Sequence, residues 1–196
     1  MMEEDQLTRD VERLRQSLPQ LPEPVVKPPF IVVSGLPGTG KSYLCHKLAE
    51  RMPLVILESD ALRKLLFPSP TYTPKESSRL FQACHCLIEE LLRRGTPLIL
   101  DATNLEERHR ERLYHIAEQI GAKLILVWVK APPEVVHQRL EERSKEAIRE
   151  DDSEADWEVH QRMKPKVQRI GRNYIAVDTS KDISPAIDKI LREINR

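Results

Sequence analysis

One segment of the sequence has residue types and spacing that indicate chemistry on phosphates. Residues 35–42 read Gly-Leu-Pro-Gly-Thr-Gly-Lys-Ser, which fits the phosphate-binding pattern G-x-x-x-x-G-K-[ST]. Glycines let backbone N–H groups turn inward around phosphate oxygens, and the N-terminus of a following helix adds a positive dipole end. An apolar run before the motif and a helix-forming run after it favour this interpretation over a simple glycine-rich turn. We therefore expect this P-loop to bind ATP with Mg²⁺.

The side chains of the P-loop have separate expected roles. Lys41 supplies a mobile cation for the β- and γ-phosphates, and the hydroxyl of Ser42 supplies a ligand for Mg²⁺. The residues expected to contact ATP are Gly35, Pro37, Gly38, Thr39, Gly40, Lys41, Ser42 and Tyr43. Residues 178–181 are expected to border the adenine.

Two aspartates follow predicted strands and are expected to lie beside Lys41. Asp60 comes just after the apolar run 53–58, and Asp101 ends the run 97–101. The carboxyl ends of parallel strands meet at one edge of an open sheet, so both carboxylates should face the P-loop. Asp60 is the candidate base for an acceptor hydroxyl, and Asp101 is the candidate Mg²⁺ ligand, directly or through water. The alternatives are a helix N-cap for Asp60 and a structural hydrogen-bond acceptor for Asp101.

Three arginines are candidates for binding phosphate groups. Arg63 lies one helical turn after Asp60, where it would hold an anionic acceptor. Arg139 and Arg143 lie four residues apart on one face of a helix predicted over residues 131–149. Such a helix would form a lid that stabilises charge on the transferring group. The alternative for this pair is a solvated face paired with neighbouring glutamates.

Other features of the sequence narrow the class of nucleotide-binding protein. A GTPase would read guanine through an N-K-x-D element, which the sequence lacks, and Asp101 is followed by alanine rather than by the glutamate common in ATPase motors. A kinase therefore fits better. A local basic cluster offers either a contact for a nucleic-acid backbone or a solvated face; its members are Lys164, Lys166, Arg169 and Arg172.

The surrounding sequence predicts an α/β fold. Five near-continuous apolar runs are typical of strands covered on both faces, and helical patterns separate them; the runs are 30–34, 53–58, 97–101, 123–129 and 174–177. We expect a parallel sheet in the order 2-3-1-4-5 with a helical lid. Capping-box patterns predict helix starts at Asn104 with Glu107, and at Ser153 with Asp156.

The first 29 residues are expected to form a separate unit. Leu7, Val11 and Leu14 recur at helical spacing, and a proline-dense connector follows them. We divide the chain into this helix with its connector, residues 1–29, and a domain of residues 30–196 that carries the motifs. The helix could dock on that domain, which is the favoured alternative, or on a partner.

The composition excludes several classes of partner. The 196 residues contain 31 Lys and Arg against 31 Asp and Glu, so no global charge favours nucleic acid or membrane. There is no apolar run long enough to span a bilayer and no apolar signal-peptide core. The three cysteines, Cys45, Cys84 and Cys86, show no disulfide framework, so we expect a cytoplasmic protein.

From about residue 30 to about residue 180, the sequence resembles the P-loop kinase family that includes polynucleotide 5′-hydroxyl kinases, zeta toxins and small ATP-binding kinases. Residues 60–63 match the Asp-x-x-Arg element of the polynucleotide kinase branch, in which the aspartate is the general base and the arginine contacts the acceptor's phosphate. Residues 101–104 match Asp-x-Thr-Asn, and Arg139 and Arg143 match the lid pattern Arg-x-x-x-Arg.

This resemblance implies transfer of the γ-phosphate of ATP to a hydroxyl. The first expectation for the acceptor is the 5′-hydroxyl of RNA or DNA. Small kinases of the family also share the segments 59–64 and 72–74, so a small-molecule acceptor (nucleoside, sugar, nucleotide-sugar or antibiotic) is the alternative. An ATP-binding switch without transfer chemistry is the third possibility.

Overall fold

The computed structural model describes residues 2–145 and 155–196 and contains a five-stranded sheet. Every strand pairing is parallel, and the strand order is β2-β3-β1-β4-β5. The strands are β1 Pro29–Ser34, β2 Val55–Glu58, β3 Leu98–Asp101, β4 Lys123–Lys130 and β5 Ile175–Asp178. The expected α/β fold, sheet and strand order are confirmed.

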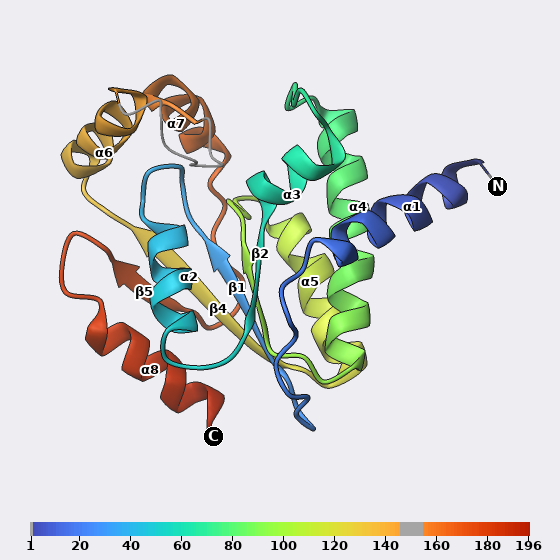
Figure 1. Ribbon diagram of the computed structural model, residues 1–196. Helices are drawn as coiled ribbons and strands as arrows, with labels where there is room; N and C mark the ends of the chain where they lie inside the picture. Colours follow the sequence, from blue (N-terminus) through green and yellow to red (C-terminus); the bar gives the residue numbers. More distant parts are fainter. Residues whose placement is uncertain (1, 146–154) are drawn as a thin grey trace.

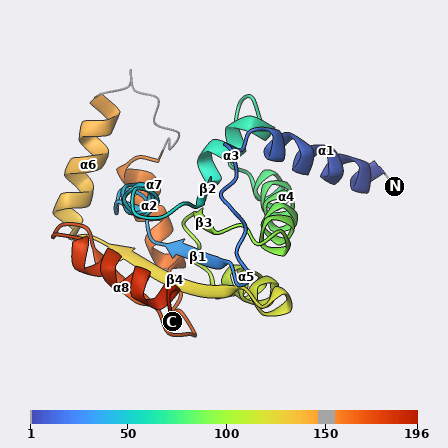
Figure 2. The same ribbon diagram turned by 60° about the horizontal axis from the view of Figure 1, so that its bottom comes forward.

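Helices cover both faces of the sheet, as Figures 1 and 2 show. Phe30 and Val32 of β1 belong to one apolar core, whereas Ile31 and Val33 belong to the other. This alternation follows from the two-residue period of a strand, and burial on both faces explains the uninterrupted apolar runs. The helices over the first face are α4 Pro74–Arg93 and α5 Glu107–Ile120, and those over the second are α2 Lys41–Ala49 and α8 Ser184–Ile194.

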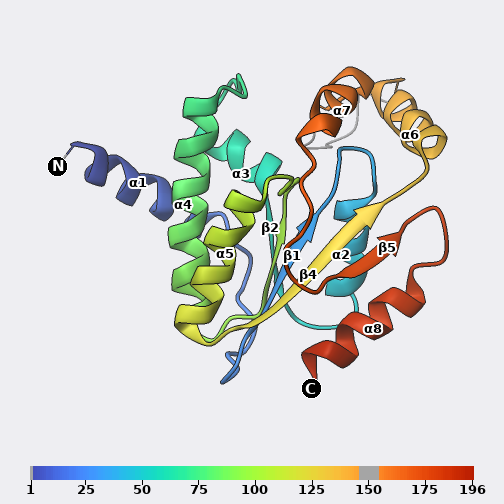
Figure 3. The ribbon, with the colours of Figure 1, turned by 180° about the vertical axis from the view of Figure 1, so that it is seen from behind.

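Further helices lie toward the carboxyl edge of the sheet. The short helix α3, Ser59–Leu66, directly follows β2, and α6 follows β4. Figure 3 shows α6 and α7 beyond the ends of β1 and β4, above the P-loop. Their bounds are Pro133–Lys145 for α6 and Trp157–Met163 for α7, with a 3₁₀ turn, η1, at Lys164–Lys166.

The N-terminal helix α1, Met2–Gln16, packs against α3 and α4. Leu14 is fully buried in the same core as Phe30. The carboxylate of Asp10 accepts two hydrogen bonds from the guanidinium of Arg79, at 2.6 and 2.7 Å. The helix therefore docks on the body of this chain. The division into residues 1–29 and 30–196 stays a prediction.

Two helix starts differ in detail from the expected capping boxes. The α5 helix begins with Glu106 at the N-cap, so the predicted cap at Asn104 is wrong. Asn104 instead has φ 43°. Its side-chain amide donates to the Val33 carbonyl at 2.8 Å, and this bond connects the segment after β3 to β1. At α7, Asp156 caps the helix by accepting from the Val159 amide, and the expected partner Ser153 lies outside the described residues.

Within the two described ranges, no helix combines the length and apolar character that crossing a membrane requires. The three cysteines are free thiols, of which Cys45 and Cys84 are buried and Cys86 is exposed. The cytoplasmic location expected from them stays a prediction.

Candidate active site

The P-loop makes a tight turn between β1 and α2 that only glycine fits at two positions. Gly38 and Gly40 have φ of 78° and 87°, in the left-handed region. A Cβ on Gly38 would lie 2.9 Å from the Leu140 side chain, and one on Gly40 would lie 3.0 Å from the Thr179 hydroxyl. The turn is therefore in close contact with α6 on one side and with the end of β5 on the other.

The start of α2 suits an anion. Its N-cap is Gly40, and no side chain caps the helix. The first N–H groups of a helix have no partner within the helix, so an uncapped start offers them to a ligand together with the positive end of the helix dipole. The hydroxyl of Thr39, the residue before the N-cap, donates to the Leu36 carbonyl at 2.7 Å.

Lys41 lies close to both predicted aspartates. Burial lowers the pKa of Lys41, and the carboxylates of Asp101 and Asp60 act in the opposite direction. Its Nζ donates to the Leu36 carbonyl of its own loop at 3.2 Å. Because Coulombic effects weaken with distance, their influence on Lys41 indicates that the three groups share one environment. The carboxyl edge of the sheet thus brings them together.

Asp101 has the character of a ligand residue. It ends β3, pairs in register with Val33 of β1, and is 4% exposed. Its Oδ2 is buried and has no hydrogen-bond partner within the described residues. Buried carboxylate oxygens are rarely left unpaired unless a ligand satisfies them. An Mg²⁺ ion would do so, and Ser42, which is exposed at the start of α2, would supply the hydroxyl ligand.

The same region does not resemble a closed protein metal centre. Across residues 2–145 and 155–196, no group of three or more His, Cys, Asp or Glu side chains is placed to hold a metal. Mg²⁺ in nucleotide sites commonly takes only one or two protein ligands plus phosphate oxygens and water, so a hydroxyl and one carboxylate fit this ion.

Asp60 lies in the first turn of α3, and Glu58 is the N-cap residue. The alternative that Asp60 is merely the N-cap of this helix is therefore wrong. The position of Asp60 on a helix that starts at the end of β2 leaves it half-buried at the same edge of the sheet as Asp101.

Arg63 is buried and ion-paired. It is 6% exposed, and its Nη1 donates to Glu76 Oε1 at 2.6 Å. Nη2 donates to the Ser77 hydroxyl at 3.2 Å, and the guanidinium lies 4.8 Å from the centre of the Tyr72 ring. In this arrangement Arg63 binds α4 rather than standing open to an acceptor.

The two lid arginines also contact the protein. Arg139 donates to the hydroxyl of Thr179 at 2.9 Å and to its carbonyl at 2.8 Å. The same hydroxyl donates to the Thr39 carbonyl at 2.6 Å. Arg143 donates to the carbonyl of Ala155, at the start of the segment that leads into α7. The predicted helix is present as α6, and residues 146–149 of that prediction lie outside the described residues. Its two arginines join it to Thr179 and to the segment that precedes α7.

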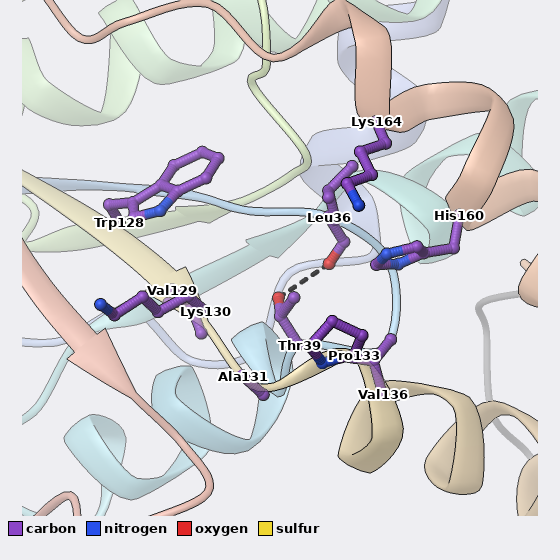
Figure 4. A pocket seen from close by; sticks show the side chains of 10 residues that line it. All are labelled: Leu36, Thr39, Trp128, Val129, Lys130, Ala131, Pro133, Val136, His160 and Lys164. Carbon is purple, nitrogen blue, oxygen red and sulfur yellow. Dashed lines mark hydrogen bonds between the residues drawn. The ribbon is translucent and has the colours of Figure 1, made fainter.

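A histidine that the sequence did not single out contacts the P-loop from α7. His160 is 6% exposed, and its Nδ1 lies 2.8 Å from the carbonyl oxygen of Pro37. Since a carbonyl only accepts, Nδ1 carries the hydrogen. His160 stacks on Trp157, whose ring meets His137 of α6 edge-on. Figure 4 shows His160 beside Leu36 in a pocket of about 120 Å³ at the end of β4.

The other residues that are predicted to contact ATP differ in how exposed they are. Pro37 is buried, with its carbonyl engaged by His160, whereas Tyr43 is 54% exposed on α2. A Cβ on Gly35 would lie 2.5 Å from the Val129 carbonyl, so this glycine allows β1 and β4 to approach each other where the P-loop begins.

A family model described as an AAA domain matches residues 30–170, well over half of the chain. The chain belongs to the AAA_33 family. The match includes the P-loop, both aspartates and the lid arginines. The resemblance to P-loop kinases is confirmed at the level of family and fold.

Two curated kinases and one solved kinase structure are similar to this AAA_33 member. An L-seryl-tRNA(Sec) kinase from Methanococcus maripaludis is 26% identical over 176 residues, covering 84% of this chain and 64% of the relative. A gluconokinase from Gluconobacter oxydans is 29% identical over 93 residues, covering 45% of this chain and 52% of the relative. The chain thus spans less than two thirds of either relative's length. The structure of an APS kinase from Mycobacterium tuberculosis, solved with AMPPNP and APS, has a TM-score of 0.65 at 14% identity. The match covers 89% of this chain and 100% of that chain, so the two share the fold.

Proposed function

We propose that this protein is a kinase that transfers the γ-phosphate of ATP to an acceptor hydroxyl. The observation that carries the proposal is the convergence of Lys41, Asp60 and Asp101 beside an uncapped helix start. Phosphoryl transfer needs a cation on the phosphates, a proton acceptor and a metal ligand, and these three side chains supply one of each. The kinase relatives support this assignment.

In this proposal each residue has a defined task. The P-loop amides and Lys41 bind the β- and γ-phosphates, and the lid brings Arg139 and Arg143 toward the transferring group. Asp60 orients the acceptor hydroxyl and takes its proton. Ser42 and Asp101 hold Mg²⁺, which neutralises phosphate charge when bound.

For the acceptor, we propose an alcohol that carries no phosphate next to the reacting hydroxyl. The support is that Arg63, the residue that would hold such a phosphate, is buried against Glu76. The hydroxyl would belong to a small molecule, in line with the gluconokinase relative, or to a group presented by a larger molecule, as the name of the seryl-tRNA kinase indicates for that protein.

The 5′-hydroxyl of RNA or DNA is the second candidate. The exposed side chains of Lys164, Lys166 and Arg169 favour it, because they lie on the segment that leaves α7 beside the P-loop. The fourth member of the basic cluster supports it less, since Arg172 pairs with Glu118 at 2.6 Å and covers the Tyr114 ring.

The experiment incubates the protein with γ-labelled ATP, Mg²⁺ and a panel of sugars, nucleosides, aminoacyl-tRNA and 5′-hydroxyl oligonucleotides. We expect label on a hydroxyl of one acceptor class and none with Lys41→Ala, because the loop amides cannot replace the cation. Lys47→Ala is the matched control, since Lys47 pairs with Glu50 on the exposed side of the same helix. Near-normal transfer by Lys41→Ala would remove the P-loop from the mechanism. Tight ATP binding without transfer to any acceptor would favour a non-catalytic switch.

A further inference from the structure

The buried ion pair between Arg63 and Glu76 joins the helix that carries Asp60 to the start of α4. Both side chains are 7% exposed, and their charged atoms are 2.6 Å apart. The guanidinium cannot lose its proton at any ordinary pH, so a buried Arg63 requires a counterion. Glu76, which lies thirteen residues further along the chain, is that counterion.

The same carboxylate fastens the loop between α3 and α4. Its Oε2 accepts from the backbone amide and from the hydroxyl of Thr71, both at 2.8 Å. Its Oε1 accepts from the Tyr72 amide at 3.3 Å as well as from Arg63. Tyr72 has φ 54° and places its ring against the guanidinium. One carboxylate therefore both neutralises Arg63 and holds the loop that covers it.

These bonds also keep Glu76 ionised. Burial alone would raise its pKa, but hydrogen bonds from Thr71 and Arg63 outweigh burial and lower the pKa of Glu76 to about 2. At neutral pH the pair carries one positive and one negative charge, and it presents no net charge to an acceptor. One N–H group of Arg63 has no acceptor, since its Nε is buried without a hydrogen-bond partner among the described residues.

We propose that Glu76 is a specificity-determining residue that occupies Arg63 and so excludes acceptors with a phosphate beside the reacting hydroxyl. The proposal rests on the kinase function proposed above and names a residue that decides its acceptor class. It follows that removing the negative charge of Glu76 converts Arg63 into an anion site, because the buried guanidinium then takes its counterion from solution.

The test is calorimetric titration of inorganic phosphate into protein saturated with AMPPNP and Mg²⁺, so that the P-loop is already filled. We expect no phosphate binding by the wild type that depends on Arg63. Glu76→Gln should bind phosphate at least ~10-fold more tightly than the wild type, since a charge-assisted contact to phosphate has this strength. The double variant Arg63→Gln/Glu76→Gln should lose that binding.

A control variant and three further outcomes decide the test. Thr71→Val removes one loop bond but leaves the charge pair, so it should gain no phosphate site. Phosphate binding by the wild type that Arg63→Gln abolishes would overturn the proposal, even if Glu76→Gln does not fold. So would a folded Glu76→Gln protein with no gain over the double variant. Failure of AMPPNP itself to bind would count against the kinase function instead, because the difference between the single and double variants still reports on Arg63.

Discussion

Two buried carboxylates, those of Glu76 and Asp101, differ in whether the chain itself supplies their partners. Glu76 accepts four hydrogen bonds from residues of α3 and the following loop. Asp101 is equally buried, yet its Oδ2 has no such partner in the part of the chain that the structure describes. A satisfied buried carboxylate stabilises a local structure, whereas an unsatisfied one indicates a place for a ligand. This contrast separates Glu76, whose partners lie within the chain, from Asp101, the proposed metal ligand.

Glu76 should make the stability of the protein sensitive to acid. Its folded pKa of about 2 lies below the ordinary value of 4.5. A depressed pKa contributes stability that is present above the unfolded value and is lost as pH falls toward the folded one. Urea denaturation between pH 6 and pH 2 should therefore show the wild type losing its advantage over Glu76→Gln below about pH 4.5. An advantage that does not change over this range would show that the pKa of Glu76 is the same in the folded and the unfolded protein.

At the level of helices, α6 is held to the P-loop through Thr179. The hydroxyl of this residue accepts from Arg139 and donates to Thr39, so it links the lid, the end of β5 and the phosphate loop. His160 adds a second link from α7 to Pro37. The lid is therefore connected to the loop on two sides, and a change at either contact should affect the bound phosphates.

Arg139→Ala should lower kcat by on the order of 10²–10³-fold, the range seen when one positioned donor for transition-state charge is removed. Thr179→Val should cost less, because it removes the hydroxyl's bonds to Arg139 and Thr39 but keeps the guanidinium and its bond to the Thr179 carbonyl. Steady-state kinetics with varied ATP separates kcat from KM. Arg192→Ala is the control, because Arg192 is an exposed residue of α8. Equal, small effects of the first two changes would mean that Arg139 acts only in packing.

The helix α1 belongs to the main core through Leu14, which is fully buried. Leu14→Ala should lower the free energy of unfolding by ~2–5 kcal/mol, the usual cost of such a cavity. Leu21→Ala in the connector is the control, because its side chain is 36% exposed. Urea unfolding gives both values. A loss under ~0.5 kcal/mol for Leu14→Ala would show that α1 unfolds independently of the sheet.

Across the whole molecule, the sequence predicts what depends on local pattern. The five strands follow from apolar runs that two helical layers cover, and the P-loop follows from a contiguous motif. Arg139 and Arg143 share a helix face because of their spacing. Asn104 shows where a local rule fails, since its side chain is used to join β3 to β1 instead of capping α5.

The partners of the predicted residues depend on contacts between distant segments. Nothing near His160 in the sequence indicates that it binds Pro37, 123 residues away. Glu76 has a partial signal, because Thr73 and Glu76 fit a capping box and Thr73 does cap α4. Its carboxylate nevertheless binds Arg63 and the Thr71 loop. The position of Arg63 one helical turn after Asp60 could be predicted from the sequence, but its buried ion pair with Glu76 could not.

In the proposed reaction, Asp60 activates an acceptor hydroxyl for attack on the γ-phosphate of ATP. The most direct test follows the labelled γ-phosphate of ATP in the wild type and in Asp60→Asn, with AMPPNP affinity measured on both. Asparagine keeps the shape but cannot accept a proton, so transfer to the hydroxyl should fall ~10²–10⁴-fold while AMPPNP binding stays the same. Asp188→Asn on α8 is the control, as its side chain is 50% exposed. Undiminished transfer by Asp60→Asn would show that Asp60 is not the base, and label released only to water by the wild type would show that the protein is not a kinase.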